Sequence, residues 1–313
     1  MVLSSLLVFI GFVFLIKGAD WMVNGSSLLA KKNKIPDLVI GLTIVAFGTS
    51  APELVVNIVA AYDGHSDIVL GNVIGSNIFN LFMILGIVGL IFPIAVQSTT
   101  VWKEIPISLL AAIILLFLGN HYMGVSRWDA LLLMCMFLLF LYYIYKQMKK
   151  DSIAVETAPI ESSQLKIWGF IALGLIGLVI GGKLIVDNAV NIAHDLGVSE
   201  KIIGLTIIAA GTSLPELMTS VVAALKKNSD IAIGNIIGSN IFNIFLILSV
   251  SSLVRPISFT KVFNTDIYLI IGGTVFLFMA MFIGKKKTLD RWESALLLIT
   301  FISYTTYLVS KEL

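Results

Sequence analysis

Residues 41–61 read GLTIVAFGTSAPELVVNIVAA, and residues 204–224 read GLTIIAAGTSLPELMTSVVAA, with 14 of 21 positions identical. Residues 71–82, GNVIGSNIFNLF, match residues 234–245, GNIIGSNIFNIF, at 10 of 12 positions. The offset is the same for both pairs, since 204 − 41 and 234 − 71 both give 163. Chance similarity between apolar stretches does not place Gly, Thr, Ser, Pro, Glu and Asn identically. The chain therefore contains an internal repeat.

The composition indicates a membrane protein. Of 313 residues, 58% are hydrophobic and 13% are charged, and the mean hydropathy is +0.99. Soluble domains carry about a quarter charged residues, so this chain has too little polar surface to face water all round. The net charge of +2 comes without a long basic run, and we expect no nucleic-acid partner. Cys135 is the single cysteine and cannot form an internal disulfide.

Ten stretches approach the roughly 20 apolar residues that a membrane helix needs. They are 3–29, 39–61, 69–91, 104–120, 127–147, 166–190, 202–224, 231–254, 265–284 and 290–309. We predict an all-α membrane protein with a first repeat at 1–147, a short cytoplasmic linker at 148–165 and a second repeat at 166–313. The apolar first 16 residues lack a preceding basic region, and we expect them to begin the first span rather than to form a removable signal.

Five spans separate equivalent points of the two repeats. Five is odd, so the second copy must cross the membrane in the opposite sense, and its site should lie near the bilayer midplane between the repeats. An orientation with the N-terminus outside places 14 Lys and Arg residues in inner loops and five in outer segments, which favours it. We expect a multi-pass protein of the cell (plasma) membrane that functions as a monomer.

The hexapeptides GTSAPE (48–53) and GTSLPE (211–216) lie in the middle of their spans. Proline removes one N–H and clashes with the carbonyl four residues earlier, so backbone oxygens of the preceding turn should become available. In each hexapeptide the threonine and the glutamate are four residues apart and share a helix face. The candidate ligands here are the side chains of Thr49, Glu53, Thr212 and Glu216, with backbone oxygens from Ala46–Thr49 and Ala209–Thr212.

Glu53 and Glu216 are the central residues of the prediction. An ionised side chain at the middle of the bilayer costs about 2.5–3.5 kcal/mol on the insertion scale. Two such side chains also repel, so without a cation one should bind a proton. Ca²⁺ takes 6–8 oxygen ligands and accepts both carboxylates and carbonyls. The sequence has no cluster of His or Cys, which disfavours softer metals.

The two GSNIFN segments (75–80 and 238–243) add neutral oxygen ligands. Serine and asparagine four residues apart share one face in each segment, and they suit Na⁺ or a water beside Ca²⁺. These four residues are Ser76, Asn80, Ser239 and Asn243. Taken singly, such side chains often only join helices, and the GxxxG spacings of the same segments favour close packing. Asp20 and Asp187 are expected to be caps or salt-bridge partners, and Lys17 and Lys183 to snorkel or pair.

These motifs resemble the two α-repeats of the Ca²⁺/cation antiporter superfamily, in particular prokaryotic-type sodium/calcium exchangers. The resemblance implies four cation sites, with Ca²⁺ held by Glu53, Glu216 and backbone oxygens near Thr49 and Thr212. It implies Na⁺ sites at Ala46, Ser50, Ser76, Ala209, Ser213 and Ser239, with Asn80 and Asn243 beside the centre. It also implies that the first and sixth helices slide against the rest, and it involves no cofactor beyond the transported ions Ca²⁺ and Na⁺.

Some members of that superfamily, notably K⁺-dependent exchangers, carry Asp where this chain has Asn243. The Asn pair leaves two formal charges in the site, which argues against a K⁺ requirement. Three Na⁺ against two carboxylates leave +1 and one Ca²⁺ leaves 0, so exchange at the 3:1 ratio that the resemblance implies is electrogenic. The linker is too short for the large regulatory domains of animal relatives, and we expect no such regulation.

Three other functions stay open on the sequence alone. Glutamates can carry protons, so a Ca²⁺/H⁺ antiporter on the same scaffold is the nearest alternative. A cation channel would use the same residues in a fixed pore. An intramembrane hydrolase using Ser50 or Ser213 needs a base, and the histidines fall in or near loops, away from mid-span.

Overall fold

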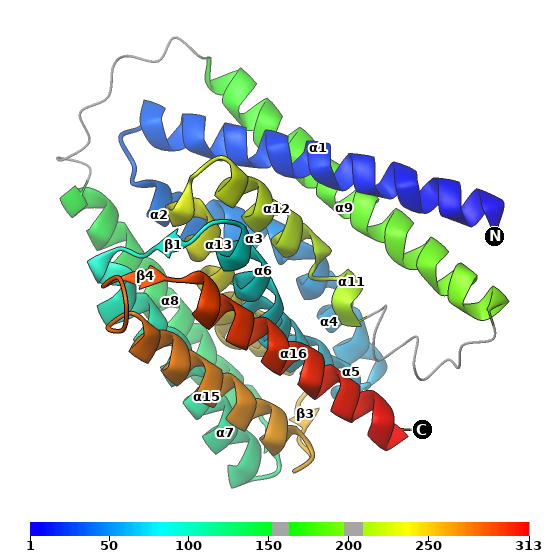
Figure 1. Cartoon of the computed structure of the whole chain (residues 1–313). Coiled ribbons are helices and arrows are strands. Elements are labelled where there is room, and N and C mark those ends of the chain that lie inside the picture. Colours follow the sequence, from blue (N-terminus) through cyan, green and yellow to red (C-terminus); the bar gives the residue numbers. More distant parts are fainter. Residues whose placement is uncertain (152–162, 197–208, 313) are drawn as a thin grey trace.

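The computed structural model describes residues 1–151, 163–196 and 209–312, and their secondary structure is almost entirely helical (Figure 1). Eight helices of this part of the chain are long and apolar enough to cross a membrane. They are built from α1 (Val2–Lys32), α5, η2 and α6 (Ser66–Ile78, Phe79–Ile84, Leu85–Ile91), η3 and α7 (Thr100–Glu104, Ile105–His121), α8 (Arg127–Asp151), α9 (Gln164–Asp195), α13, η6 and α14 (Ser229–Phe242, Asn243–Ile247, Leu248–Val254), α15 (Phe263–Ala280) and α16 (Arg291–Glu312).

A broken helix adds a ninth span if it is counted as one. It runs through α2 (Asp37–Ile40), η1 (Gly41–Val45) and α3 (Ala46–Thr49), bends by 46° and continues as α4 (Ala51–Asp63). Ser50 sits at the break with φ −85° and ψ 4°, and Pro52 follows in the first turn of α4. Proline has no N–H to bond to the carbonyl four residues earlier, and its ring clashes with that carbonyl. The bend therefore falls where the GTSAPE motif predicts.

The second repeat shows the same break in the part that the structure describes. α11 (Ala209–Gly211) is followed by Ser213, with φ −92° and ψ 7°, and then by α12 (Leu214–Leu225), which has proline in its first turn. The first residues of the predicted span at 202–224 lie outside the described residues. Residues 152–162 of the predicted linker do so as well.

The most deeply buried helices are those that carry GSNIFN. In the apolar part of the span formed by α13, η6 and α14, 94% of the residues are buried, against 72% in the span of α5, η2 and α6 and 17% in that of α16. Both helices widen into a π-helical turn at the end of the motif, where η2 begins at Phe79 and η6 at Asn243. π-helical turns are rare and frequently mark functional sites. The polar segments of the repeat therefore form the centre of the bundle, and the remaining helices surround them.

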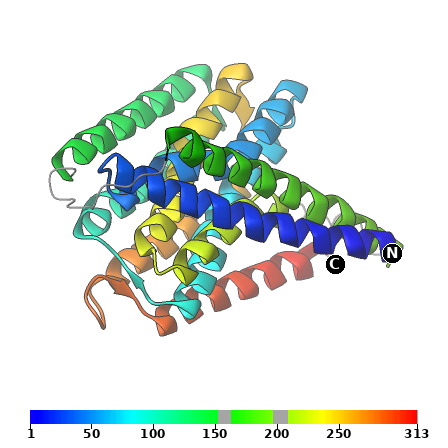
Figure 2. The same cartoon turned by 90° about the horizontal axis from the view of Figure 1, so that it is seen from above.

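The longest helices, α1 and α9, lie side by side along one edge of the molecule (Figures 1 and 2). Glycines bring the two backbones into direct contact. A Cβ placed on Gly18 would lie 2.7 Å from the backbone nitrogen of Leu178, and one on Gly174 would lie 2.6 Å from that of Met22. Gly11 meets Gly181 in the same way. The two helices thus run antiparallel and form one closely packed pair.

Four two-residue strands, which the all-α prediction did not include, tie the repeats together. β1 (Ile94–Ala95) pairs antiparallel with β4 (Thr288–Leu289), and β2 (Gly124–Val125) pairs with β3 (Ile257–Ser258). β1 and β3 stand 163 residues apart, the offset of the sequence repeat. The two pairs lie toward opposite ends of α15 and α16 (Figure 1). Backbone pairing in loops carries no apolar periodicity, so the sequence could not reveal these strands.

Candidate cation-binding centre

Glu53 and Glu216 occupy equivalent places in the first turns of α4 and α12, and both are 1% exposed. Each glutamate is bonded by the serine at the helix break of the other repeat. Ser50 donates to Glu216 Oε1 at 2.9 Å, and Ser213 donates to Glu53 Oε1 at 3.4 Å. The two broken helices therefore cross, and the glutamate of each lies against the helix break of the other.

The GSNIFN helices complete this arrangement from either side. Ser239 Oγ lies 3.1 Å from Ser50 Oγ, and Ser76 Oγ lies 3.2 Å from Ser213 Oγ. All four serines are 3% exposed or less. The structure thus brings four predicted serines and both predicted glutamates into one buried cluster.

Among the buried acceptor oxygens of this region that have no hydrogen-bond partner in the described residues, four belong to predicted ligands. They are Oε2 of Glu53, Oε2 of Glu216, Oδ1 of Asn80 and Oδ1 of Asn243. Leaving such atoms unsatisfied is costly, and in a native protein it indicates an unseen partner. Two carboxylate and two amide oxygens are hard ligands of the kind that Ca²⁺ and Na⁺ prefer, and two full charges suit a divalent ion. The donor set of this chain therefore fits the predicted cations.

The two free amide oxygens are oriented by further asparagines. Asn80 donates through Nδ2 to Asn240 Oδ1, and Asn243 donates through Nδ2 to Asn77 Oδ1, both at 3.1 Å. Because the amide nitrogens are engaged in this way, the Oδ1 atoms of Asn80 and Asn243 are the ones left free. The orientation follows from the hydrogen-bond network.

The predicted threonines are held by a different pair of asparagines. Thr49 donates to Asn235 Oδ1 at 3.0 Å, and Asn72 donates to Thr212 Oγ1 at 3.3 Å. The backbone oxygen of Ala46 accepts from Ser50 N at 3.0 Å and is thus engaged within its own helix in this structure. Ala209 is the first residue of α11, directly after the part of the repeat that lies outside the described residues.

Six polar residues around the centre were missed by the sequence analysis. They are Asn57, Asn72, Asn77, Ser220, Asn235 and Asn240. Asn235 Nδ2 lies 2.9 Å from Ser220 Oγ and 3.3 Å from the backbone oxygen of Glu216, and Asn57 Nδ2 lies 2.7 Å from both Asn72 Oδ1 and the Glu53 oxygen. All six lie in the repeated segments, and Asn72 and Asn235 follow the first glycine of GNxIGSNIF. Their repetition was the sequence signal that could have identified these six residues.

On the sequence prediction of Ca²⁺ transport, Asn235→Leu is expected to raise the Ca²⁺ concentration for half-maximal transport by about 10- to 100-fold, the usual cost of losing a partner that orients a metal ligand. Leucine fills the volume but releases both the Thr49 hydroxyl and the Glu216 backbone. Ca²⁺ titration of transport in proteoliposomes measures the shift, and Asn235→Ser should recover part of it. Asn120→Leu is the control, since it breaks the paired amides of Asn120 and Asn264 on other helices. An equal shift in both leucine variants would contradict a role specific to the centre.

The sequence of the chain is similar to those of known proteins. A family profile described as "Sodium/calcium exchanger protein" matches residues 3–146 and 166–310. The chain is 38% identical to the putative antiporter CaxA of Alkalimonas amylolytica over 99% of the chain and 100% of that protein. It is 31% identical to the sodium/calcium exchanger MaX1 of Methanosarcina acetivorans over 97% and 98%.

The fold is similar to a solved one. A structure of the sodium-calcium exchanger NCX_Mj superimposes with a TM-score of 0.85 at 34% sequence identity, covering 98% of this chain and 99% of that one. At this identity and coverage the likeness extends to the whole bundle.

Proposed function

The chain belongs to the sodium/calcium exchanger family, and on that premise we propose that it carries Ca²⁺ against Na⁺ through the centre between Glu53 and Glu216. One observation carries the proposal. Two buried carboxylates lie at repeat-equivalent helix breaks, each against the serine of the other break and each with an oxygen that no described residue satisfies. A cation is the ligand that relieves both the repulsion and the missing hydrogen bonds.

Within this centre we assign Ca²⁺ to Glu53 and Glu216, with backbone oxygens near Thr49 and Thr212. Na⁺ ions would occupy flanking positions, for which we propose Ala46, Ser50, Ser76, Ala209, Ser213 and Ser239. Asn80 and Asn243 would offer amide oxygens to a central ion or to its water. The serine pairs at 3.1 and 3.2 Å support this division, because each joins a helix break to a GSNIFN helix beside a glutamate.

We propose that the two repeats are inverted, with ten spans and the N-terminus outside, in the cell membrane, and that one chain is the working unit. The reciprocal serine–glutamate bonds support a twofold relation between the repeats. The strand pairs toward opposite ends of the bundle support the opposite sense of the second copy. The close pair of α1 and α9 would then move as a unit against the other helices to alternate access.

Catalysis by Ser50 or Ser213 gains no support from the geometry. Both hydroxyls are bonded to glutamates, and the three histidines of the chain, His65, His121 and His194, are exposed. A Ca²⁺/H⁺ antiporter would use the same two carboxylates and differs only in the counter-ion. The experiment below separates it from Na⁺ exchange.

Purified protein in liposomes loaded with Na⁺ is expected to take up Ca²⁺ when diluted into Na⁺-free medium, whereas K⁺ or H⁺ gradients alone should drive no uptake. Three Na⁺ leaving for each Ca²⁺ entering exports one positive charge. An inside-positive potential should therefore accelerate uptake and an inside-negative one should slow it, with a driving force of about 2.3 kcal/mol per 100 mV. Ca²⁺ flux at clamped potentials measures both effects. Uptake driven by a proton gradient without Na⁺ would instead identify a Ca²⁺/H⁺ antiporter.

A further inference from the structure

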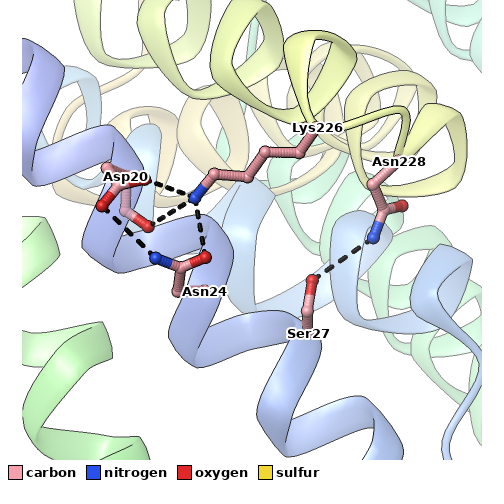
Figure 3. Close-up of polar contacts among 5 residues, drawn as sticks. All are labelled: Asp20, Asn24, Ser27, Lys226 and Asn228. Carbon is pink, nitrogen blue, oxygen red and sulfur yellow. Dashed lines mark hydrogen bonds and ion pairs between the residues drawn. The ribbon is translucent and has the colours of Figure 1, made fainter.

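An ion pair outside the cation centre joins α1 to the turn after α12. Lys226 Nζ lies 2.5 Å from Asp20 Oδ1 and also donates to Asn24 Oδ1 at 2.7 Å and to the Asp20 backbone oxygen at 3.2 Å (Figure 3). Asn24 in turn donates to Asp20 Oδ2 at 3.3 Å. The sequence analysis expected Asp20 to be a cap or a salt-bridge partner, and the salt bridge is confirmed.

A second residue of the turn after α12, Asn228, also forms hydrogen bonds to the first repeat. Asn228 donates to Ser27 Oγ at 3.3 Å, next to the contacts of Lys226 (Figure 3). It also donates to Asp37 Oδ2 at 3.0 Å. α12 begins beside Glu216 and ends at this turn. A shift of α1 relative to α12 must therefore break the contacts of Lys226, whose side chain is 31% exposed and can move into solvent.

The repeat offset identifies a second pair of positions with the charges exchanged. Adding 163 to Asp20 gives Lys183 on α9, and subtracting 163 from Lys226 gives Asp63 at the end of α4. The acid and the base have changed places, yet the two positions still carry opposite charges. Both side chains are exposed, and they share no ion pair in the structure, which describes both residues. One pair is thus made in this state and its equivalent is open.

Other charged groups lie near the open pair. Asp187 follows Lys183 by one helical turn and is the repeat equivalent of Asn24, and His65 follows Asp63 by two residues. The Arg255 side chain lies against Gly64. None of these groups makes an ion pair with Lys183 or Asp63 in the described part of the chain, so both remain available to each other.

We propose that the two pairs are alternating latches: Asp20–Lys226 holds the state seen here, and Lys183–Asp63 closes when α1 and α9 shift to the opposite state. This rests on the proposed function, since it assumes exchange of conformation between inverted repeats. In both pairs the acid comes from the first repeat and the base from the second, and we expect the movement that breaks one ion pair to make its equivalent. The two states thereby remain close in energy, as a carrier that must populate both requires.

The test uses chemical cross-links in a Cys135→Ser background. Asp20→Cys with Lys226→Cys, and separately Asp63→Cys with Lys183→Cys, are treated with a short bis-methanethiosulfonate reagent. We expect both pairs to cross-link in proteoliposomes, each cross-link to stop Ca²⁺ flux, and reduction to restore it. Adding Lys226→Gln to the 63/183 pair should raise its cross-linking rate about two- to fivefold, the effect of losing one partly exposed ion pair.

A matched control is Lys227→Gln in the same 63/183 background, because it removes a charge from the same turn without touching the latch. No cross-link at 63/183 under any combination of Na⁺ and Ca²⁺, while 20/226 cross-links readily, would overturn the proposal. An unchanged 63/183 rate in Lys226→Gln would do so as well. Cross-linking is read on gels without any flux, so failure of the latches is distinguishable from failure of Na⁺/Ca²⁺ exchange, in which wild-type protein shows no Na⁺-driven uptake.

Discussion

Glu53→Gln and Glu216→Gln are each expected to lower Na⁺-driven Ca²⁺ uptake by about 100-fold or more. Glutamine keeps the size of the side chain and can still accept from Ser213 or Ser50. It removes one of the two charges that balance Ca²⁺ in a buried site, and losing one partner of a buried charge arrangement costs about 3–5 kcal/mol. Uptake into Na⁺-loaded proteoliposomes measures the loss.

The chain offers a control with the same chemistry elsewhere. Glu104 is also buried, and it accepts a hydrogen bond from Tyr143 on a neighbouring helix, away from the centre. Glu104→Gln should transport within about twofold of the wild type, because glutamine can still accept from the tyrosine. Thermal unfolding in detergent verifies that all three variants fold. Wild-type transport by either centre variant, or equal loss in Glu104→Gln, would show that the two carboxylates do not hold the ion.

Much of the centre could be predicted because its residues are repeated. A proline and an acid within an apolar span are costly features, and GTSAPE and GTSLPE repeat both at one offset, which predicted one shared site. The repeat could not predict which side-chain atoms contact one another. Ser50 bonds to Glu216, 166 positions away, rather than to Glu53 in its own motif. That crossing depends on how α4 and α12 pack, which no local pattern encodes.

The asparagines around the threonines show a second limit. Asn235 was visible in the repeat, but a single asparagine in a membrane helix is more often interhelical glue than part of a site. Only the structure shows its three contacts, with Thr49, Ser220 and the Glu216 backbone. Residues that orient ligands carry no charge signature of their own, and their function lies in partners far along the chain.

Glycine packing was predicted at one interface and missed at another. The GxxxG spacing of Gly234 and Gly238 indicated close approach, and both lie against the backbone of the broken helix near Leu38 and Leu42. The equivalents, Gly71 and Gly75, would face positions 201–209 by the repeat offset, most of which lies outside the described residues. Gly11, Gly18 and Gly25 recur every seven residues on α1, and their partners lie about 145–174 positions away on α9. Spacing alone did not identify that partner.

Gly18→Val and Gly174→Val are expected to destabilise the protein by about 1–3 kcal/mol each, the range for overpacking a close contact. A Cβ at either position would fall 2.6–2.7 Å from a backbone nitrogen of the facing helix. A backbone atom cannot rotate away as a side chain can, so α1 and α9 must separate along the crossing. Thermal unfolding in detergent measures the loss of stability.

Transport should fall further than stability in these two variants. If α1 and α9 move as one unit, separating them uncouples the latch residues on α1 from those on α9, and Ca²⁺ uptake should fall by about tenfold or more even where the protein remains folded. Gly272→Val is the matched control, because Gly272 lies on an exposed face of α15 with no atom within 4 Å of its added Cβ. Normal stability and flux in Gly18→Val would mean that the close crossing of α1 and α9 is not required, and that the two helices can move independently.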